Sequence, residues 1–520
     1  MHVAINKLST KKAKRQKRVS VILCILLGFL VLFSFLIKRY LLSADADQVY
    51  SQGLLLLPPY ATKKPRATIL DKAGAVLAIS QKKALIYAIP TQISNLLDTS
   101  KRLSSILNIS NKKIINLLNS SKSNICIIKE DIKPSIANLI KKLNLAGIGV
   151  SYYYKRIYPY KDIVNNVIGS IGPNGNGISG IEYFYNNKLK DYRQIKNLTL
   201  GLDLDIESNS QRLLKWQMER LRAKTGCFLM MNLKDDSIIA MASYKREKWH
   251  FIPEQLYLKA NISPVIMWPI MGLILSNNDK EQIFDFNNSK SWDLFYRDGT
   301  GENIVFWGPF SHDTINNIKI KNSKNSLVSI LARLGFGQKT GIDLPDEDAG
   351  YLMPISEPNL LPLVFKNTKA SAIQLLVAFT KVLSDQNNVI PHIVIHRKSH
   401  LMAKSALFPL KTIASFKKAI SEKHGISLAS ILFKGEDDSK FVSLKDPAQV
   451  VALGFYPAKD PQVVYILVLN DVTRDPRYVK GVLAQSYLIA RRASQNILAQ
   501  KRIKKRLRYF VASIEKERDS

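Results

Sequence analysis

The sequence predicts an α+β protein with an N-terminal transmembrane helix, an extended domain and a C-terminal α/β sandwich. Residues 19–37 form one uncharged apolar run, and residues 40–200 mix short apolar runs with helical stretches around 103–117 and 132–145. Residues 201–500 begin with a helix and two strands and end with two strands and a helix. The first and last elements of this region are therefore expected to share one sheet.

The membrane segment at 19–37 is about as long as a helix that crosses the ~30 Å hydrocarbon core of a bilayer. Basic residues crowd the tail at 1–18, whereas only Lys38 and Arg39 follow the run directly. This bias predicts a single pass through the cytoplasmic (inner) membrane, with the N-terminus inside and the bulk of the chain periplasmic or otherwise extracytoplasmic. A cleaved signal peptide is the alternative, but its apolar core is usually shorter and ends at a small-x-small site.

Composition and charge limit the other expectations. The chain has 520 residues, 46% of them hydrophobic, which is enough for several folded cores. Its formal net charge of +35 favours anionic surroundings such as phospholipid head groups or an acidic wall polymer, although Lys is abundant throughout. We expect no nucleic-acid partner. Cys24 lies in the apolar run, and no Cys/His cluster has metal-ligand spacing, so no metal and no cofactor are expected.

Four short motifs follow one another in residues 66–207. They read RATILDKAG at 66–74, KRIYP at 155–159, GISGIE at 177–182 and LGLDLDIE at 200–207. In this order they resemble the R-G-x-I-x-D-R-x-G, arginine–tyrosine–proline, G-x-x-G-I-E and L-T-I-D-x-x-I-Q boxes of class B penicillin-binding proteins. The resemblance implies that the pedestal residues contacting partner proteins are Arg66, Asp71, Gly74, Arg156, Tyr158, Pro159, Gly180 and Glu182.

Three later segments extend the resemblance. Residues 231–243 resemble the opening strands of the family's transpeptidase fold, 334–345 (LGFGQKTGIDLP) a loop after its second motif, and 451–457 the strand after its third. The resemblance implies a pedestal (dimerisation-like) domain at 40–200 and a transpeptidase-like (penicillin-binding) domain at 201–500. The final residues, 501–520, form a separate basic tail.

The catalytic positions of that family do not match. A serine in S-x-x-K attacks the peptide carbonyl, and the lysine accepts its proton. The only segment that fits the start of the corresponding helix is 263–271, with Pro269 after the motif. This alignment places Val265 at the serine position and Trp268 at the lysine position. Neither side chain can be acylated or take up a proton.

The second and third motifs are also in doubt. Ser323 and Asn325 are a candidate remnant of S-x-N, and the alternative is a helix N-cap in a polar loop. The Lys339-Thr340-Gly341 sequence lies in the loop that precedes the third motif, and we interpret it as a decoy. The true K-T/S-G is expected about 20–30 residues before Gly454, where Lys434 and Gly435 are a candidate remnant.

The resemblance implies a membrane-anchored component of peptidoglycan synthesis, cell division or cell-shape control. Because the nucleophile and base are missing, we expect an inactive scaffold or activator of a glycan polymerase, with that polymerase and other cell-wall proteins as partners. An active serine D,D-transpeptidase with a diverged motif is the first alternative. The second is a non-enzymatic binder of peptidoglycan or anionic wall polymer, which would use the emptied cleft and would lose binding without the tail at 501–520.

Overall fold

The computed structural model describes part of the chain. The described residues are 33, 61–120, 124–246, 259–261, 293–297, 303–307, 325–353, 368–384, 386–395, 425–433, 447–457, 460–472, 486 and 488–499. Apart from Phe33, the predicted membrane segment at 19–37 lies outside them, as do the tails at 1–18 and 501–520. Within the described ranges, no helix has the length and hydropathy needed to span a bilayer.

The chain forms two compact units. Unit 1 contains Met1–Lys63 and Lys82–Lys155, and unit 2 contains Lys64–Gln81 and Arg156–Ser520. The chain passes between them at Lys63–Lys64 and along two strands, β3 (Val76–Ala88) and β5 (Ile148–Ile157). Unit 2 continues through residue 200, so the two compact units do not coincide with the two predicted domains. The boundary between 40–200 and 201–500 stays a prediction.

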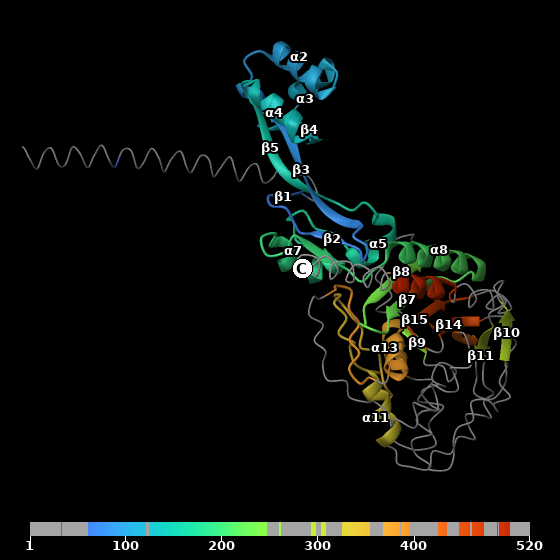
Figure 1. The fold of residues 1–520 in the computed structure, drawn as a ribbon. Helices are drawn as coiled ribbons and strands as arrows, with labels where there is room; N and C mark the ends of the chain where they lie inside the picture. The colour runs from blue at the N-terminus through green and yellow to red at the C-terminus, as the bar shows by residue number, and fades with distance from the viewer. Residues whose placement is uncertain are drawn as a thin grey trace, which may run out of the picture. The chain divides into compact units, whose positions relative to one another are not determined.

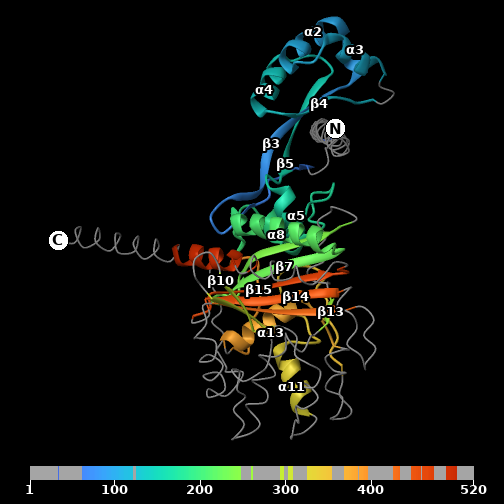
Figure 2. The ribbon, with the colours of Figure 1, turned by 90° about the vertical axis from the view of Figure 1, so that its right-hand side faces the viewer.

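Unit 1 is a small α/β body. Its elements, besides its parts of β3 and β5, are β1 (Ala61–Thr62), η1 (Pro90–Gln92), α2 (Leu96–Leu107), α3 (Asn111–Ser120), β4 (Cys126–Ile132) and α4 (Pro134–Lys142). The strand β4 pairs with β3 and β1 pairs with β5, both antiparallel. The helices α2, α3 and α4 gather at one end of these strands, where their aliphatic side chains form a core of their own (Figures 1 and 2).

The helices of unit 1 correct two predictions. The helix expected at 103–117 is divided into α2 and α3 because Asn108 adopts a left-handed conformation, with φ of 52°, that ends α2. The helix expected at 132–145 is the shorter α4, which starts at Pro134. Proline suits this place because the first turn of a helix does not need its missing N–H.

Unit 2 opens with a short sheet. The strand β2 (Thr68–Leu70) pairs antiparallel with β3 and parallel with β6 (Asn197–Thr199). Asp71 closes the turn between β2 and β3, since its Oδ1 accepts hydrogen bonds from the N–H groups of Ala73 (2.9 Å) and Ala75 (2.7 Å). The helices beside this sheet are α5 (Lys161–Ile168), α6 (Gly180–Phe184) and α7 (Asn186–Lys190).

The main sheet of unit 2 has the strand order β10-β11-β13-β14-β15-β7-β8. Its strands are β7 (Thr225–Asn232), β8 (Ile238–Lys245), β10 (Asp293–Arg297), β11 (Asn303–Trp307), β13 (Gly425–Phe433), β14 (Pro447–Tyr456) and β15 (Val463–Asn470). The early strand β7 pairs directly with the late strand β15. This confirms that the first and last elements of residues 201–500 share one sheet, while β10 and β11 were not predicted.

Helices cover both faces of the main sheet. The helix α8 (Leu204–Leu221) and helical residues 488–499 pack on one face, in a core that includes Phe228 and Tyr465. The helix α13 (Ala372–Ser384) packs on the other, together with α11 (Asn325–Leu334). Figure 2 shows this layering. The core under α13 continues to Ile69, Ile181 and Leu189, so the short sheet and the main sheet share one hydrophobic interior.

Candidate functional site

Three charged side chains from separate motifs meet inside unit 2. The Arg66 guanidinium donates to Oε2 of Glu182 from Nη2 (2.7 Å) and Nε (3.0 Å). Arg156 donates to the other carboxylate oxygen, Oε1, from Nε (2.7 Å). The exposed fractions of Arg66, Arg156 and Glu182 are 2%, 3% and 0%. One buried carboxylate therefore holds two buried cations, an arrangement that is stable only while every partner is present.

Backbone carbonyls complete this network. Nη1 of Arg66 donates to Gly175 O (3.0 Å) and to Oδ1 of Asn186 (3.1 Å), and Nη1 of Arg156 donates to Ala67 O (2.9 Å). Nη2 of Arg156 is a buried donor with no hydrogen-bond partner among the described residues. Tyr158 donates to Oε1 of Glu182 at 3.4 Å. Burial, followed by the Glu182 charge, raises the pKa of the Tyr158 phenol far above its ordinary value.

Two glycines let the backbone bring Glu182 to this place. Gly180 has φ of +57°, and a Cβ there would lie 2.4 Å from Val167 O. A Cβ on Gly177 would lie 1.8 Å from Glu182 O. Only glycine fits so close an approach of two backbone segments. Packing thus explains the G-x-x-G-I-E motif. Its glycines allow two backbone segments to approach closely, and its glutamate pairs with the two arginines.

The structure buries most of the motif residues that were expected to contact partners, and their role in partner binding stays a prediction. The side chains of Arg66, Asp71, Arg156 and Glu182 are buried, as is Gly180, and Tyr158 is half-buried. Among the eight predicted residues only Gly74 and Pro159 are exposed. A buried ion cluster offers no surface to another protein. We conclude that these residues hold unit 2 together and thereby position the exposed residues next to them.

The exposed neighbours of the cluster were missed by the sequence analysis. Ile178, Tyr183 and Phe184 flank the buried motif residues 180–182 and are 61%, 55% and 48% exposed. The motif had drawn attention to Gly180 and Glu182, whereas the adjacent aromatic residues belong to no box. The available signal was a helix as short as α6 that carries apolar residues on both of its faces.

A second buried carboxyl group lies where α8, β8 and α5 meet. Oε2 of Glu207 accepts a hydrogen bond from Met241 N (2.6 Å), and Oε1 accepts one from Nε2 of Gln211 (2.9 Å). Burial raises the pKa of Glu207 to about 7, and these two hydrogen bonds oppose the shift. The corresponding box of the family ends in glutamine, so the glutamate at 207 was a visible departure that we did not interpret.

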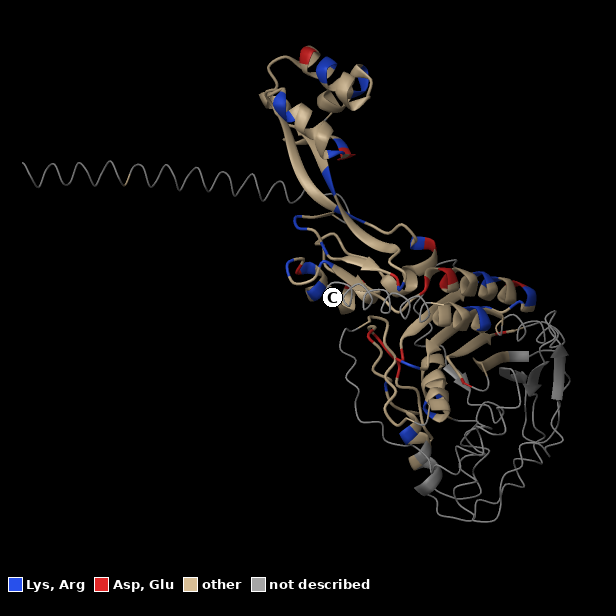
Figure 3. Cartoon of the chain, viewed as in Figure 1, with Lys and Arg blue, Asp and Glu red and all other residues tan. Residues whose placement is uncertain are grey.

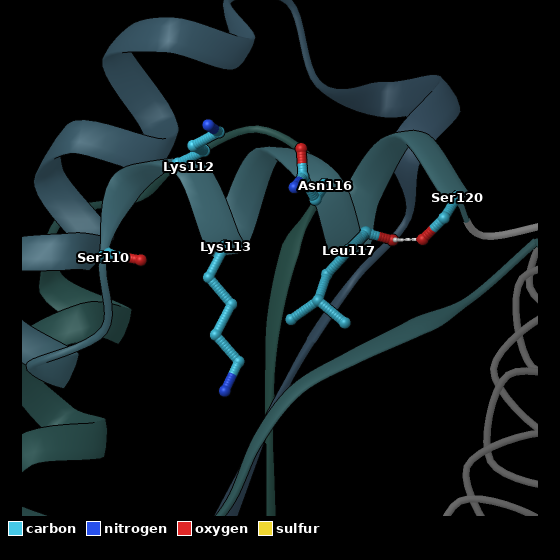
Figure 4. A pocket seen from close by; sticks show the side chains of 6 residues that line it. All are labelled: Ser110, Lys112, Lys113, Asn116, Leu117 and Ser120. Carbon is cyan, nitrogen blue, oxygen red and sulfur yellow. Dashed lines mark hydrogen bonds between the residues drawn. The ribbon is translucent and has the colours of Figure 1, made fainter.

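The remaining surface features of the described residues are modest. A hollow of about 380 Å³ lies along α3 in unit 1 and is lined by Ser110, Lys112, Lys113, Asn116, Leu117 and Ser120. Figure 4 shows Lys113 and Leu117 extending from the same side of the helix. The lining contains neither a carboxylate nor a histidine. No group of three or more His, Cys, Asp or Glu residues in the described ranges is arranged to hold a metal ion.

Comparison with known families agrees with this architecture. Residues 61–201 match the family described as "Penicillin-binding Protein dimerisation domain", and residues 311–427 match "Penicillin binding protein transpeptidase domain". The chain belongs to the class B penicillin-binding proteins. Stage V sporulation protein D of Bacillus subtilis is 24% identical to it, over 78% of this chain and 74% of that protein. The Escherichia coli peptidoglycan D,D-transpeptidase FtsI is 22% identical, over 66% and 67%.

Solved structures share the fold of this penicillin-binding protein. A peptidoglycan synthetase from Bifidobacterium adolescentis has a TM-score of 0.60 at 15% identity and covers 85% of this chain and 97% of its own. The penicillin-binding protein PBP2 of Helicobacter pylori, solved in complex with MreC, has a TM-score of 0.56 at 15% identity, over 83% and 98%. The pedestal and the mixed α/β transpeptidase-type fold expected from the sequence are confirmed.

Most predicted catalytic positions of this penicillin-binding protein are outside the described part of the chain. They are Val265, Trp268, Ser323, Lys434 and Gly435. Asn325 is the first residue of α11, which places the candidate S-x-N remnant at the beginning of that helix. The alternative, an N-cap at Ser323, therefore stays open alongside the catalytic interpretation.

The Lys339-Thr340-Gly341 sequence lies in a loop. Oε1 of Glu347 accepts hydrogen bonds from the backbone N–H and the hydroxyl of Thr340, both at 2.6 Å. Its other oxygen accepts from Gly341 N (3.1 Å). A substrate-binding K-T-G would lie on a strand with its threonine available. The threonine here is held by a neighbouring carboxylate, which agrees with the interpretation of this sequence as a decoy.

The strand β13 points to a motif that the sequence analysis missed. It pairs antiparallel with β14, with Ser427 opposite Gly454, and it begins at Gly425. The two residues before Gly425 are Lys423 and His424, so the sequence entering this strand reads K-H-G. We infer that this K-x-G fits the third motif better than Lys434 and Gly435, which follow the other end of β13. Requiring threonine or serine in the middle position had hidden it.

Proposed function

We propose that this class B penicillin-binding protein is a membrane-anchored scaffold of peptidoglycan synthesis or division that activates a glycan polymerase and does not itself cross-link peptides. One contrast carries the proposal. The cluster of Arg66, Arg156 and Glu182 is complete and buried, whereas our sequence alignment places Val265 and Trp268 at the nucleophile and base positions. On this alignment, the part of the protein that gives it shape is kept and the part that would perform acyl transfer is replaced.

Acyl transfer by this fold requires a hydroxyl that a nearby amine can deprotonate. The side chain of valine has no atom that could form the acyl-enzyme, and the indole of tryptophan cannot accept the proton. Contacts with a partner protein require only a surface that is held in place. Loss of the serine is therefore compatible with a function that depends on binding.

The partner expected from this proposal is an integral glycan polymerase or another cell-wall protein. The relative PBP2 of Helicobacter pylori was solved in complex with MreC, which supports a role in assembly for proteins of this fold. The run at 19–37 would anchor the chain with its N-terminus in the cytoplasm. We propose single-pass attachment to the inner membrane and an extracytoplasmic location for both compact units.

The test is acylation of the purified full chain by a fluorescent penicillin, with detection by intact mass. We expect no adduct at large drug excess, while circular dichroism shows a folded protein and an active class B penicillin-binding protein is labelled in parallel. A stoichiometric adduct on a serine of this chain would overturn the proposal. Co-purification with the host glycan polymerase from cross-linked cells is the expected positive result.

An active transpeptidase with diverged motifs is the second candidate. It is favoured by the K-H-G sequence that enters β13 and by the match of residues 311–427 to the transpeptidase family. Peptide mapping of any penicillin adduct would identify its serine. The third hypothesis, binding of peptidoglycan or anionic wall polymer, predicts salt-sensitive sedimentation with isolated peptidoglycan that is lost when residues 501–520 are removed.

A further inference from the structure

An aromatic surface covers the outer side of α6 and the segment after it. Ile178, Tyr183, Phe184 and Tyr192 are all at least 40% exposed, whereas Ile181 between them is fully buried. Large apolar side chains are common on protein surfaces when they are scattered, whereas these four lie within residues 178–192. We call these four residues, with the exposed cations described next, the base patch.

The cations of the base patch come from α7 and the residues that follow it. Lys188, Lys190, Arg193 and Lys196 are all exposed. Between residues 178 and 197 the acidic residues are Glu182, which is buried against two arginines, and Asp191, which is half-buried. The surface of this stretch is therefore aromatic and positively charged. Figure 3 shows the basic positions on α7 and beyond it.

The base patch is rigidly supported. Glu182 and Gly180 are buried beneath it, and the Arg66 guanidinium joins Glu182 to Asn186 at the start of α7. Lys190 donates a hydrogen bond to Asn176. The exposed side chains of the base patch therefore project from a segment whose opposite side is held by the buried ion cluster. A surface held in this way can make contacts without first paying for its own ordering.

The base patch is also where the chain enters unit 2 from its N-terminal side. Ala67 N donates to Leu189 O (2.8 Å), and Thr68 N donates to Lys196 O (2.9 Å). The start of unit 2 is therefore hydrogen-bonded to the segment that carries the patch. A location of the patch at the membrane rests on the proposed membrane anchor, while the composition of the patch does not depend on it.

We propose that the base patch lies in the head-group region of an anionic phospholipid bilayer. Aromatic rings with a polar edge prefer the membrane–water interface, and lysine and arginine near them are attracted by anionic lipid. A protein interface of the usual kind is instead depleted of lysine. Lysine supplies three of the four exposed cations here. The observations therefore favour lipid over a protein as the occupant.

The test places tryptophan at the patch in the full chain. Phe184→Trp is compared with Leu97→Trp, because Leu97 is a 69% exposed apolar residue on α2 of unit 1. Each variant is reconstituted in nanodiscs of neutral lipid with or without phosphatidylglycerol, using brominated acyl chains as quenchers. The spectrum of the unmodified chain, which has five tryptophans, is subtracted.

We expect bromine to remove about half or more of the added fluorescence of Phe184→Trp, since an interfacial side chain lies ~5–10 Å into the head-group boundary. Quenching should be stronger with phosphatidylglycerol, weaker after Lys188→Glu with Lys190→Glu, and absent for Leu97→Trp. Equal quenching of both tryptophans, or none, would overturn the proposal. A protein-binding patch would also overturn the proposal. In that case Phe184→Trp is not quenched, and Phe184→Ser abolishes co-purification of a membrane protein.

A chain without an anchor gives a distinguishable result. It would not be retained in nanodiscs, and flotation with phosphatidylglycerol vesicles then becomes the measurement. Flotation that is lost on combining Tyr183→Ser with Phe184→Ser supports the base patch without the anchor. Flotation unaffected by this change overturns the proposal. Neither readout depends on penicillin acylation or on polymerase activity.

Discussion

The phenol of Tyr185 donates a hydrogen bond of 2.9 Å to Oδ2 of Asp343, a residue 158 positions later in the chain. Oδ1 and Oδ2 of Asp343 also accept hydrogen bonds from Ile393 N (2.5 Å) and Val394 N (2.9 Å), respectively. Burial, followed by the Asp343 charge, raises the pKa of Tyr185 far above its ordinary value. One buried carboxylate thereby joins the end of α6 to the loop after α11 and to residues 393–394.

Removing the Tyr185 hydroxyl should weaken this junction. We expect Tyr185→Phe to lower the free energy of unfolding by about 1–3 kcal/mol, because a buried carboxylate loses one of its donors. Urea denaturation of the full chain measures the change. Tyr183→Phe is the matched control on the same helix, where the side chain is 55% exposed, and it should be neutral. Equal effects of the two substitutions would contradict the assignment.

Glu207 should make stability depend on pH. Its pKa is about 7 in the folded protein and about 4.5 when unfolded, so between these values the folded state binds more protons. The free energy of unfolding should therefore fall as pH rises from about 4.5 through 7, by roughly 3 kcal/mol at most. Glu207→Gln should remove this dependence. Glu219→Gln, an exposed position of α8, should leave the pH profile unchanged.

The buried ion cluster should respond strongly to neutralisation of its carboxylate. Glu182→Gln leaves Arg66 and Arg156 buried without a counter-charge, and we expect a loss of about 3–5 kcal/mol. Asp98→Asn is the control, since the Arg102–Asp98 pair is about half exposed on both sides and should change stability by less than about 1 kcal/mol. Thermal unfolding followed by circular dichroism compares the two. A loss for Glu182→Gln no greater than for the control would exclude a stabilising cluster.

Gly180 and Gly74 differ in what surrounds them. Both have positive φ, but a Cβ on Gly180 would clash with Val167 O, whereas one on Gly74 has nothing within 4 Å. We expect Gly74→Ala to cost about 1–2 kcal/mol from backbone strain alone and Gly180→Ala about 1–3 kcal/mol more. Urea denaturation of the two variants gives the difference. Similar losses would mean that the backbone near Val167 moves aside.

Much of the fold followed from local pattern. The strands β7, β8, β14 and β15 are short apolar runs with turn residues between them, and such runs are predictable without knowledge of tertiary contacts. The break between α2 and α3 depends on a single residue, Asn108, whose left-handed conformation no periodicity reveals. The strands β10 and β11 lie in a region of mixed polarity, where neither the alternation typical of a strand nor the 3.6-residue period of a helix was evident.

The sequence predicted which residues make up the candidate site but not that they form a buried ion cluster. Arg66, Arg156 and Glu182 stood out because their motifs resemble a known family, and charged residues are ordinarily expected at the surface. Their burial results from pairing with Glu182 across 116 positions for Arg66 and 26 positions for Arg156, which a linear pattern cannot show. The residues that do face solvent, Tyr183 and Phe184, were passed over because apolar residues are ordinarily assigned to the core.

The two strands that connect the units have a consequence for how this protein can be altered. Apart from Phe33 and residues 61–63, the described part of unit 1 is an excursion of the chain that departs after Gln81 and returns at Arg156. Ser80 Oγ lies 3.4 Å from Nη1 of Arg156, so the points of departure and return are neighbours within unit 2. A short linker between them would replace the whole excursion while the buried ion cluster keeps its partners. We therefore expect residues 82–155 to be exchangeable as a cassette while unit 2 keeps its fold.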